Sequence, residues 1–403
     1  MKQHPATSRR RSQGLSLIET LVGLAIALIA MLIVFQVFSA SGERSRTTTS
    51  GSDAQVAGSL ALFQLDRDLK MAGMGFGLLP PTGVAGGVGG CTLNAYNSAL
   101  AVADVNFPLM PVQIIQGVDA LGVVNGSPAQ IAVTYGDSAY FALARHFNAS
   151  TTTSKKLDTR DAFQLGDIVL VTRSDTNNVG SCAMVEITGV PAPDDTFTIN
   201  HAQGGTYTSV YTGAGTVPTM NAAAGVNTLV AATGFVYNLG PRPQRKLWQV
   251  RPAGAAGANL LVWNDTLHSD TQTQVTEGVV NLQAEYGVDD GCGAVCIAAL
   301  LAAGAVANDG IISPTEWTIT APADPTRLLA VRFAVLARSQ QYEKTAVTTV
   351  APFWANDAAG HSFTMFNVDG TADSTPGNAN DWRHYRYRVY ESAVPLRNLI
   401  WGK

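Results

Sequence analysis

The chain has 403 residues, of which 14% are charged, and its net charge at neutral pH is -4. A domain that relies on phosphate contacts is normally basic overall, so nucleic acid is not expected as the main partner. The low charge content, together with plentiful Gly, Ala, Thr and Val, indicates a β-rich exported protein rather than a helical cytosolic enzyme.

The N-terminal segment combines a basic leader with a long apolar stretch. Arg9, Arg10 and Arg11 precede an apolar run from Leu21 to Val37. The positive cluster holds an N-terminus on the cytoplasmic side of a membrane, and the run is long enough for a spanning helix of about 20 residues. Glu19 stands at the head of this run, where a carboxylate costs on the order of 2 to 3 kcal/mol. An acid in this position predicts a functional residue that has a partner.

The residues around Glu19 resemble a known signal. The run Gly14-Leu15-Ser16-Leu17-Ile18-Glu19 is similar to the class III signal of type IV pilins and pseudopilins. The resemblance implies that a prepilin peptidase cuts between Gly14 and Leu15 and then N-methylates Leu15. It also implies that Glu19 pairs with the N-terminal amine of a neighbouring subunit, which removes the cost of either charge alone.

Two simpler interpretations of the N-terminus compete with the pilin signal. An ordinary secretory signal also has a basic start and an apolar core, and Val37-Phe38-Ser39-Ala40 offers a cleavage site after small residues. A plain signal-anchor helix is the other. Glu19 counts against both, because a charge at the head of the apolar region serves no purpose in a discarded peptide or a simple anchor.

A single helix is predicted from Ser16 to Met71. Val56, Leu60 and Phe63 recur at helical spacing beyond the apolar run, and the glycines and prolines between residues 73 and 81 stop the pattern. The expected organisation is a leader at 1-14, a transmembrane half of the helix at 15-38, an extracytoplasmic half at 39-77 and a β-rich globular head at 78-403. The predicted fold class is therefore α+β, with a long N-terminal helix packed on a mostly antiparallel head.

Two further runs narrow the resemblance to one family. Phe63 to Gly73 looks like the helix end of PilW-type minor pilins, and Tyr390 to Asn398 is similar to their closing strand. Major pilins commonly have a glycine and a proline where this chain has Leu28 and Gln36, so the resemblance favours a minor subunit over the repeated filament subunit. Within the helix end, the charged residues 66 to 68 are expected to form a solvated face with local charge pairs.

The head is predicted to be mostly antiparallel strands separated by turns. The expected strands are Gln130 to Tyr135, Asp167 to Arg173, Cys182 to Thr188, Leu229 to Tyr237, Leu247 to Arg251, Asn259 to Trp263, Val275 to Tyr286, Leu328 to Arg338 and His384 to Tyr390. The expected long surface loops are Ser150 to Asp161, His201 to Gly225 and Asn367 to Asp381.

The chain has four cysteines, an even number that favours disulfides in an exported protein. Three pairings are possible. Cys292 and Cys296 are close enough to close a local loop, which would leave Cys91 to join Cys182. A zinc site is the alternative, although four thiolates usually come as two close pairs and Cys91 and Cys182 stand alone.

Catalytic motifs are absent from the sequence. The six histidines show no metal-ligand spacing, and no nucleophile elbow or phosphate loop is present. No enzyme activity, cofactor or dedicated metal site is predicted. Two alternatives stay open on the surface: calcium in an irregular loop, and a strand of DNA on the basic face of the final predicted strand, for which a solvated sheet face is preferred. The candidate residues are Asp289, Asp290, Asp369 and Asp373 for calcium, and His384, Arg386 and Arg388 for DNA.

These patterns predict a minor pilin of a type IV pilus that acts in a priming or tip complex. The expected partners are prepilin peptidase, other minor and major pilins, and the inner-membrane pilus assembly platform. The expected location is the inner membrane, crossed once, with a periplasmic head, and the pilus after assembly. A minor pseudopilin of a type II secretion system, and a membrane-anchored periplasmic enzyme or adhesin, are the alternatives.

Overall fold

The structure is a computed structural model of the chain. It describes residues 16-76, 90-98, 100, 102-118, 126-138, 144-173, 181-191, 195-203, 209, 220-222, 233-251, 259-289, 310, 312, 314, 316-322, 325-354, 362-368 and 380-400. The chain divides into two compact units, with the boundary between Ser52 and Asp53. The second unit contains every strand that the structure describes and is called the head below.

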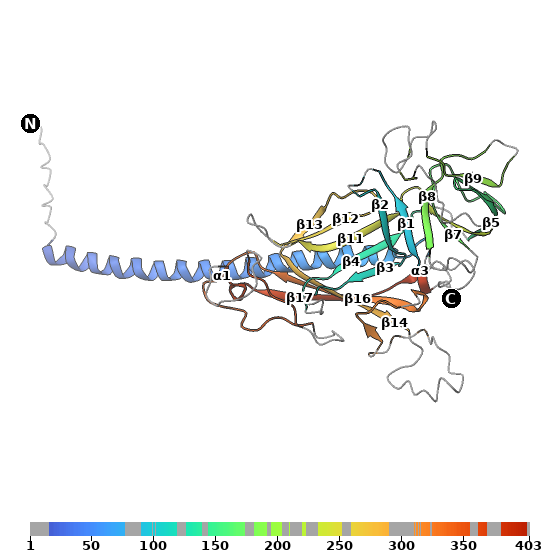
Figure 1. Cartoon of the computed structure of the whole chain (residues 1–403). Helices are drawn as coiled ribbons and strands as arrows, with labels where there is room; N and C mark the ends of the chain where they lie inside the picture. Colours follow the sequence, from blue (N-terminus) through green and yellow to red (C-terminus); the bar gives the residue numbers. More distant parts are fainter. Residues whose placement is uncertain are drawn as a thin grey trace, which may run out of the picture. The chain divides into compact units, whose positions relative to one another are not determined.

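One long helix, α1 (Leu17-Met71), accounts for the N-terminal part of the described chain (Figure 1). Its bounds confirm the prediction of a helix from Ser16 to Met71. The helix ends because two glycines follow it in the left-handed region, Gly73 with φ of 77° and Gly75 with φ of 88°. Side chains are strained there and glycine is not, so the turn after α1 depends on both residues.

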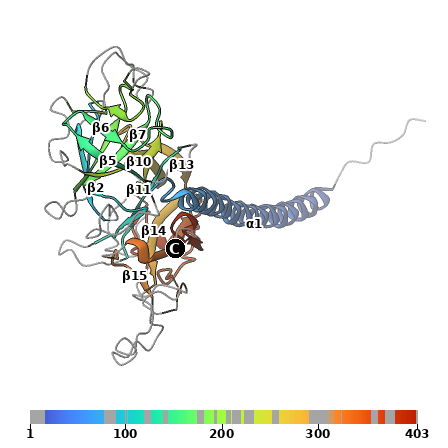
Figure 2. The ribbon, with the colours of Figure 1, turned by 90° about the vertical axis from the view of Figure 1, so that its right-hand side faces the viewer.

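The largest sheet of the head has eight strands in the order β2-β1-β8-β7-β10-β5-β6-β9. Only β1 and β8 pair in parallel, and the other neighbours are antiparallel. Figure 2 shows β5, β6, β7 and β10 side by side. The strands are β1 (Thr92-Tyr96), β2 (Asp104-Pro108), β5 (Arg145-Ser150), β6 (Ser154-Leu157), β7 (Ile168-Arg173), β8 (Ser181-Glu186), β9 (Thr198-Asn200) and β10 (Gly234-Gly240).

Two smaller antiparallel sheets complete the head. The five-stranded sheet has the order β13-β12-β11-β4-β3, with β3 (Val112-Ile115), β4 (Gln130-Tyr135), β11 (Gln244-Arg251), β12 (Leu260-Asp265) and β13 (Thr273-Glu277). The four-stranded sheet has the order β15-β14-β16-β17, with β14 (Val279-Val288), β15 (Trp317-Thr318), β16 (Leu328-Arg338) and β17 (Tyr387-Pro395). The short helices are η3 (Pro325-Arg327), η4 (Trp382-His384) and α3 (Arg397-Ile400).

The C-terminal part of α1 belongs to the main core of the head. Its apolar residues recur every three or four positions, so they share one face of the helix, and Ala61, Leu65 and Leu69 are completely buried. They pack with side chains of both smaller sheets, such as Trp248 from β11 and Phe333 from β16. The eight-stranded sheet has a separate apolar cluster on each face. The head is therefore held together by three buried clusters, and a fourth lies on the outer face of β16 and β17.

The α+β prediction is confirmed, and the differences from the expected strands have local causes. The run Val275 to Tyr286 was predicted as one strand but forms two, because Gly278 has φ of 85° and breaks the pairing. The loop predicted from Ser150 to Asp161 contains β6, so that prediction is wrong for Ser154-Leu157. The other two predicted loops lie mostly outside the described residues. The final strand begins at Tyr387 instead of His384, which lies in η4.

Candidate assembly site

The first turn of α1 carries the only charged side chain of the apolar segment. Leu17-Ser39 has a mean hydropathy of 2.8 and is long enough to cross a membrane, and its side chains are exposed. The Glu19 amide donates to the carbonyl of Ser16 (2.9 Å), and the Thr20 hydroxyl donates to the carbonyl of Leu17 (2.8 Å). An acid in the first turn is favoured by the helix dipole. Within the described part of the chain, nothing pairs with the Glu19 carboxylate. Gly14 and Leu15 lie outside the described residues.

At the other end of α1, one carboxylate is buried in the head. Asp68 is 2% exposed, and its Oδ2 lies 3.1 Å from Nζ of Lys246 on β11. The Lys246 ammonium also lies 4.6 Å from the ring centroid of Trp263, in position for a cation-π contact. The expectation of a solvated face is therefore wrong for Asp68, although the expected local charge pair is present, because Nη2 of Arg67 lies 3.6 Å from its Oδ1. It fits Asp66, which forms a local pair with Lys70 at 2.6 Å.

The C-terminal run that resembles PilW-type pilins meets the end of this helix. The side-chain amide of Asn398 donates to the carbonyls of Lys70, Met71 and Ala72, at 3.4, 3.2 and 3.0 Å. These carbonyls are among those that a helix end leaves without intrahelical partners. Asn398 thus caps α1 from more than 300 residues away, and it joins the two runs that carry the resemblance.

A second contact between α1 and the C-terminal run depends on a glycine. Gly58 of α1 faces the ring of Tyr390 on β17, and a Cβ built at Gly58 would lie 2.1 Å from a ring carbon. A distance this short is a steric clash, so the close approach of helix and strand requires glycine unless the ring moves. Helix α1 therefore contacts the C-terminal part of the chain at two points: Gly58 meets Tyr390 of β17, and the end of the helix meets Asn398 of α3.

The cysteine prediction is resolved for one pair. Cys91 and Cys182 form a disulfide across a sequence separation of 91 residues, and both are buried. This bond excludes both thiolates from a zinc site. Cys292 and Cys296 lie outside the described residues, so their pairing stays a prediction.

The alternatives for surface ligands have limited support. Asp289 is buried, and its carboxylate accepts a hydrogen bond from the amide of Gly310 (2.8 Å). The other three calcium candidates lie outside the described residues, and among the residues that are described no cluster of three or more metal-binding side chains occurs. On the basic face, Arg386 pairs with Glu343 at 3.0 Å, which partly neutralises it.

The sequence did not identify Lys246 as the partner of Asp68 at the end of α1. Nothing in its local run distinguishes it from a surface lysine, and its partner lies 178 residues earlier in the chain. Asn398 was quoted as part of the C-terminal run, but its role as a helix cap becomes visible only in the structure. Both residues act at the end of α1, where the head contacts the helix that leads from Glu19.

Comparisons with known proteins agree with this geometry. Residues 242-398 match the family model of the type IV pilus-assembly protein W, PilW. Residues 9-35 match the prokaryotic N-terminal methylation motif. No curated protein and no solved structure matches the chain. The first match contains Lys246, Tyr390 and Asn398, three of the head residues that contact α1.

The apolar N-terminal helix, the prepilin-type motif and the head of antiparallel sheets define the class of the protein as a type IV pilus-related pilin. Within that class, the two family matches support a PilW-type pilin with a class III signal. The matched PilW family is a structural component of pilus assembly.

Proposed function

We propose that this chain is a minor pilin that acts in the priming or tip complex of a type IV pilus. Prepilin peptidase removes residues 1-14 and N-methylates Leu15. Residues 15-38 then cross the inner membrane, residues 39-77 form the extracytoplasmic half of the helix, and residues 78-403 form a periplasmic head. The partners are other minor and major pilins and the inner-membrane assembly platform.

One observation carries this proposal: Glu19 is the single charge in an otherwise apolar, exposed helical segment. A carboxylate at the edge of a membrane is costly unless a positive group compensates it, and such residues are by default functional. The described part of the chain offers Glu19 no such group. The cleaved and methylated amine of a neighbouring subunit's Leu15 is a positive group of the right kind, and its pairing with Glu19 would set the axial register between two helices.

The test compares Glu19→Ala with Thr20→Ala as a matched control in a piliated host. Each variant removes a side chain in the first turn of α1, but only the first removes the charge. We expect mass spectrometry of the membrane-extracted protein to find N-methyl-Leu15 in both variants and an uncut precursor in Gly14→Val. We expect the Glu19→Ala protein to be lost from sheared pili and from complexes with other minor pilins, while Thr20→Ala is recovered like wild type.

Two outcomes would overturn the proposal. Normal maturation of Gly14→Val would reject the class III signal, because a bulky side chain beside the scissile bond should block the peptidase. Equal recovery of Glu19→Ala and wild type would reject the assembly role of Glu19 and favour a simple anchor. A deletion strain that loses secretion instead of pili would indicate a minor pseudopilin of a type II secretion system.

A further inference from the structure

The edges of the three described sheets differ in length. Five of their six edge strands, β2, β3, β9, β13 and β15, have two to five residues. The sixth, β17, has nine residues and is bordered on one side by β16. A sheet edge presents backbone N-H and C=O groups that can pair with another strand, and natural proteins usually keep such edges short. Strand β17 is therefore the edge of the described head that is best able to accept a further strand.

The register of β17 shows which of its backbone groups point away from β16. The Ser339 amide donates to the carbonyl of Arg386, and the Leu396 amide donates to the carbonyl of Leu329, both at 2.8 Å. In an antiparallel pair such hydrogen-bonded positions alternate with positions whose backbone groups point outward. The continuous register between these two bonds therefore assigns five outward positions to β17: Tyr387, Val389, Glu391, Ala393 and Pro395. Pro395 agrees with this assignment, because proline has no N-H and fits the open side of an edge strand.

Part of this outward row is open. The amides and carbonyls of Val389 and Ala393 form no hydrogen bonds with other described residues. Ala393 and Pro395 are exposed. Just before the strand the same side is closed, because the hydroxyl of Thr348 donates to the outward carbonyl of Tyr385 at 2.7 Å. The open row therefore belongs to β17 itself and ends at Pro395, which offers a carbonyl but no amide.

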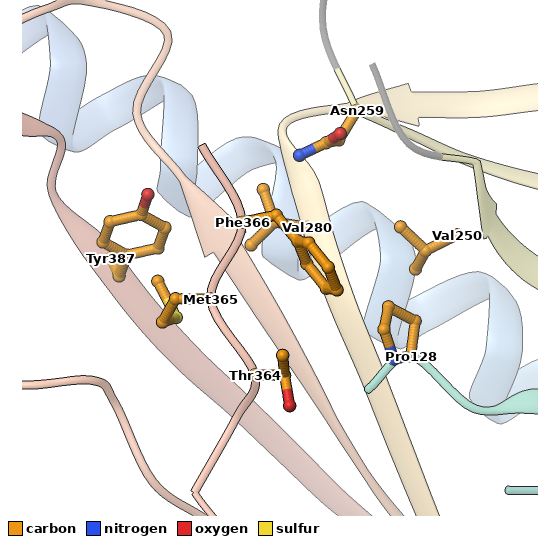
Figure 3. Close-up of a pocket in the computed structure, with 8 residues that line it drawn as sticks. All are labelled: Pro128, Val250, Asn259, Val280, Thr364, Met365, Phe366 and Tyr387. Atoms are coloured by element: carbon orange, nitrogen blue, oxygen red, sulfur yellow. The ribbon is translucent and has the colours of Figure 1, made fainter. Parts of the chain in front are cut away.

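Other elements pack on both faces of β17. On one face, Tyr390 lies against α1. On the other face, Met365 lies beside Tyr387 at the cavity drawn in Figure 3, and the indole of Trp354 donates to the carboxylate of Glu391 at 2.7 Å. The edge is consequently the side of β17 that is left for a partner, and the groups it offers there are those of the backbone.

We propose that the edge of β17 binds an extended segment of a different protein chain, which adds to the four-stranded sheet as an antiparallel strand. Strand addition to an exposed edge is a general mode of recognition in which backbone hydrogen bonds provide the affinity. This surface is separate from Glu19, so the inference goes beyond the assembly role proposed for that residue.

The direction of α1 argues against a second copy of this chain as the partner. Helix and strand run in the same direction, because Gly58 meets Tyr390 and the end of the helix meets Asn398. Antiparallel pairing of two β17 strands would make their α1 helices run in opposite directions. That arrangement does not suit two chains that are anchored in one membrane through this helix.

The side chains of β17 define the sequence that fits this edge. Directly opposite residues of an antiparallel pair lie close together on the same face, and opposite charges are favoured there. Arg388 is exposed and has no ion pair among the described residues, so we expect an acid opposite it. Exposed Glu391 favours a lysine, and the ring of Tyr390 favours a β-branched residue. A strand with these features is acetyl-Ser-Thr-Lys-Val-Ile-Glu-Thr-amide, with its valine opposite Tyr390.

The test measures binding of this peptide, with a fluorophore on its N-terminus in place of the acetyl group, to the full chain in detergent by fluorescence anisotropy. In the expected register the isoleucine amide pairs with β17 and the valine amide points away. We therefore expect a peptide methylated on the isoleucine nitrogen to bind at least about tenfold more weakly, and one methylated on the valine nitrogen to bind like the parent.

The matched variants of the protein change the edge itself. Ala393→Pro removes one outward N-H and leaves the bonds to β16, as Pro395 already does, whereas Ala393→Ser keeps the N-H. We expect about tenfold weaker binding for Ala393→Pro and wild-type binding for Ala393→Ser. Glu19→Ala should bind the peptide like wild type, so failure of either proposal leaves the other standing.

Three results would overturn the proposal. They are an absence of saturable binding to wild type, equal affinity of the two methylated peptides, and equal affinity of Ala393→Pro and Ala393→Ser. If Ala393→Pro does not fold, the two methylated peptides still decide the question on the wild-type chain. A dimer of the wild type that Ala393→Pro abolishes would assign the edge to a second copy and overturn the choice of partner.

Discussion

Replacing Asp68 by Leu should destabilise the head far more than its position on a helix surface would suggest. Asp68 and Lys246 have side chains only 3% and 8% exposed, so the ammonium left behind cannot regain water easily. Removal of one partner from a buried ion pair typically costs about 3 to 5 kcal/mol. The Trp263 ring beside Lys246 contributes about 2 kcal/mol of cation-π attraction in such a desolvated place, so the loss should fall toward the lower end of that range.

The same helix supplies a matched control. Asp66 and Lys70 form an i,i+4 pair that is 23% and 46% exposed, and such pairs contribute about 0.3 to 0.5 kcal/mol. Urea unfolding of the detergent-solubilised chain should therefore give a large loss for Asp68→Leu and a small one for Asp66→Leu. The double variant Asp68→Leu with Lys246→Met should recover most of the loss, because apolar residues of similar size replace buried pairs well.

The reasoning would be refuted by equal losses for the two aspartate variants. It would also be refuted if the double variant were as unstable as the sum of its two single substitutions, because the two groups would then act independently. Either result would mean that the energy at this position comes from packing of the helix rather than from the charge pair.

Three further predictions concern the head. Asn398→Ala removes the cap on three carbonyls at the end of α1 and should lower the free energy of urea unfolding by about 1 kcal/mol. Asn398→Asp should be no more stable than Asn398→Ala, because a carboxylate cannot donate a hydrogen bond to these carbonyls. Cys91→Ser should cost about 4 to 5 kcal/mol and lower protein levels, because the bond to Cys182 closes a loop of 91 residues; unchanged levels would contradict the prediction. Burial and the neighbouring Lys155 lower the pKa of His201 to about 3 from an ordinary 6.5, so the unfolded state binds the extra proton. Stability should fall as the pH drops from about 6.5 toward 3, and a His201→Leu variant that shows the same pH dependence would contradict this assignment.

The helix and the general class of the head were predictable from the sequence because their signals are local. The apolar run, the spacing of buried residues after it and the two left-handed glycines at its end are all readable without the fold. Strands β4 and β16 were located with their observed bounds because they are continuous apolar runs. Strands with polar sequences were missed, as with β6, in which Lys155 is completely buried and donates to the carbonyl of Thr151.

The contacts at the end of α1 were not predictable for a different reason. Asp68 stands among charged residues on a helix, where local pairing such as that with Arg67 is the normal outcome, and its buried partner Lys246 follows 178 residues later. Long-range polar pairing depends on the register of strands, and one residue of slippage moves a side chain to the other face.

Asp68 and Glu19 are carboxylates on the same helix, and their different surroundings support different roles. Asp68 is buried within the head, where its own chain provides the compensating cation at 3.1 Å. Glu19 lies in an apolar segment built for a membrane, and the described residues provide no cation for it. Both environments penalise an isolated charge. A carboxylate that pairs with a cation of its own chain stabilises the fold. A carboxylate without such a cation can be compensated only by a group of another molecule. For this reason the substitution of Asp68 is expected to act on unfolding, and that of Glu19 on assembly while the head stays folded.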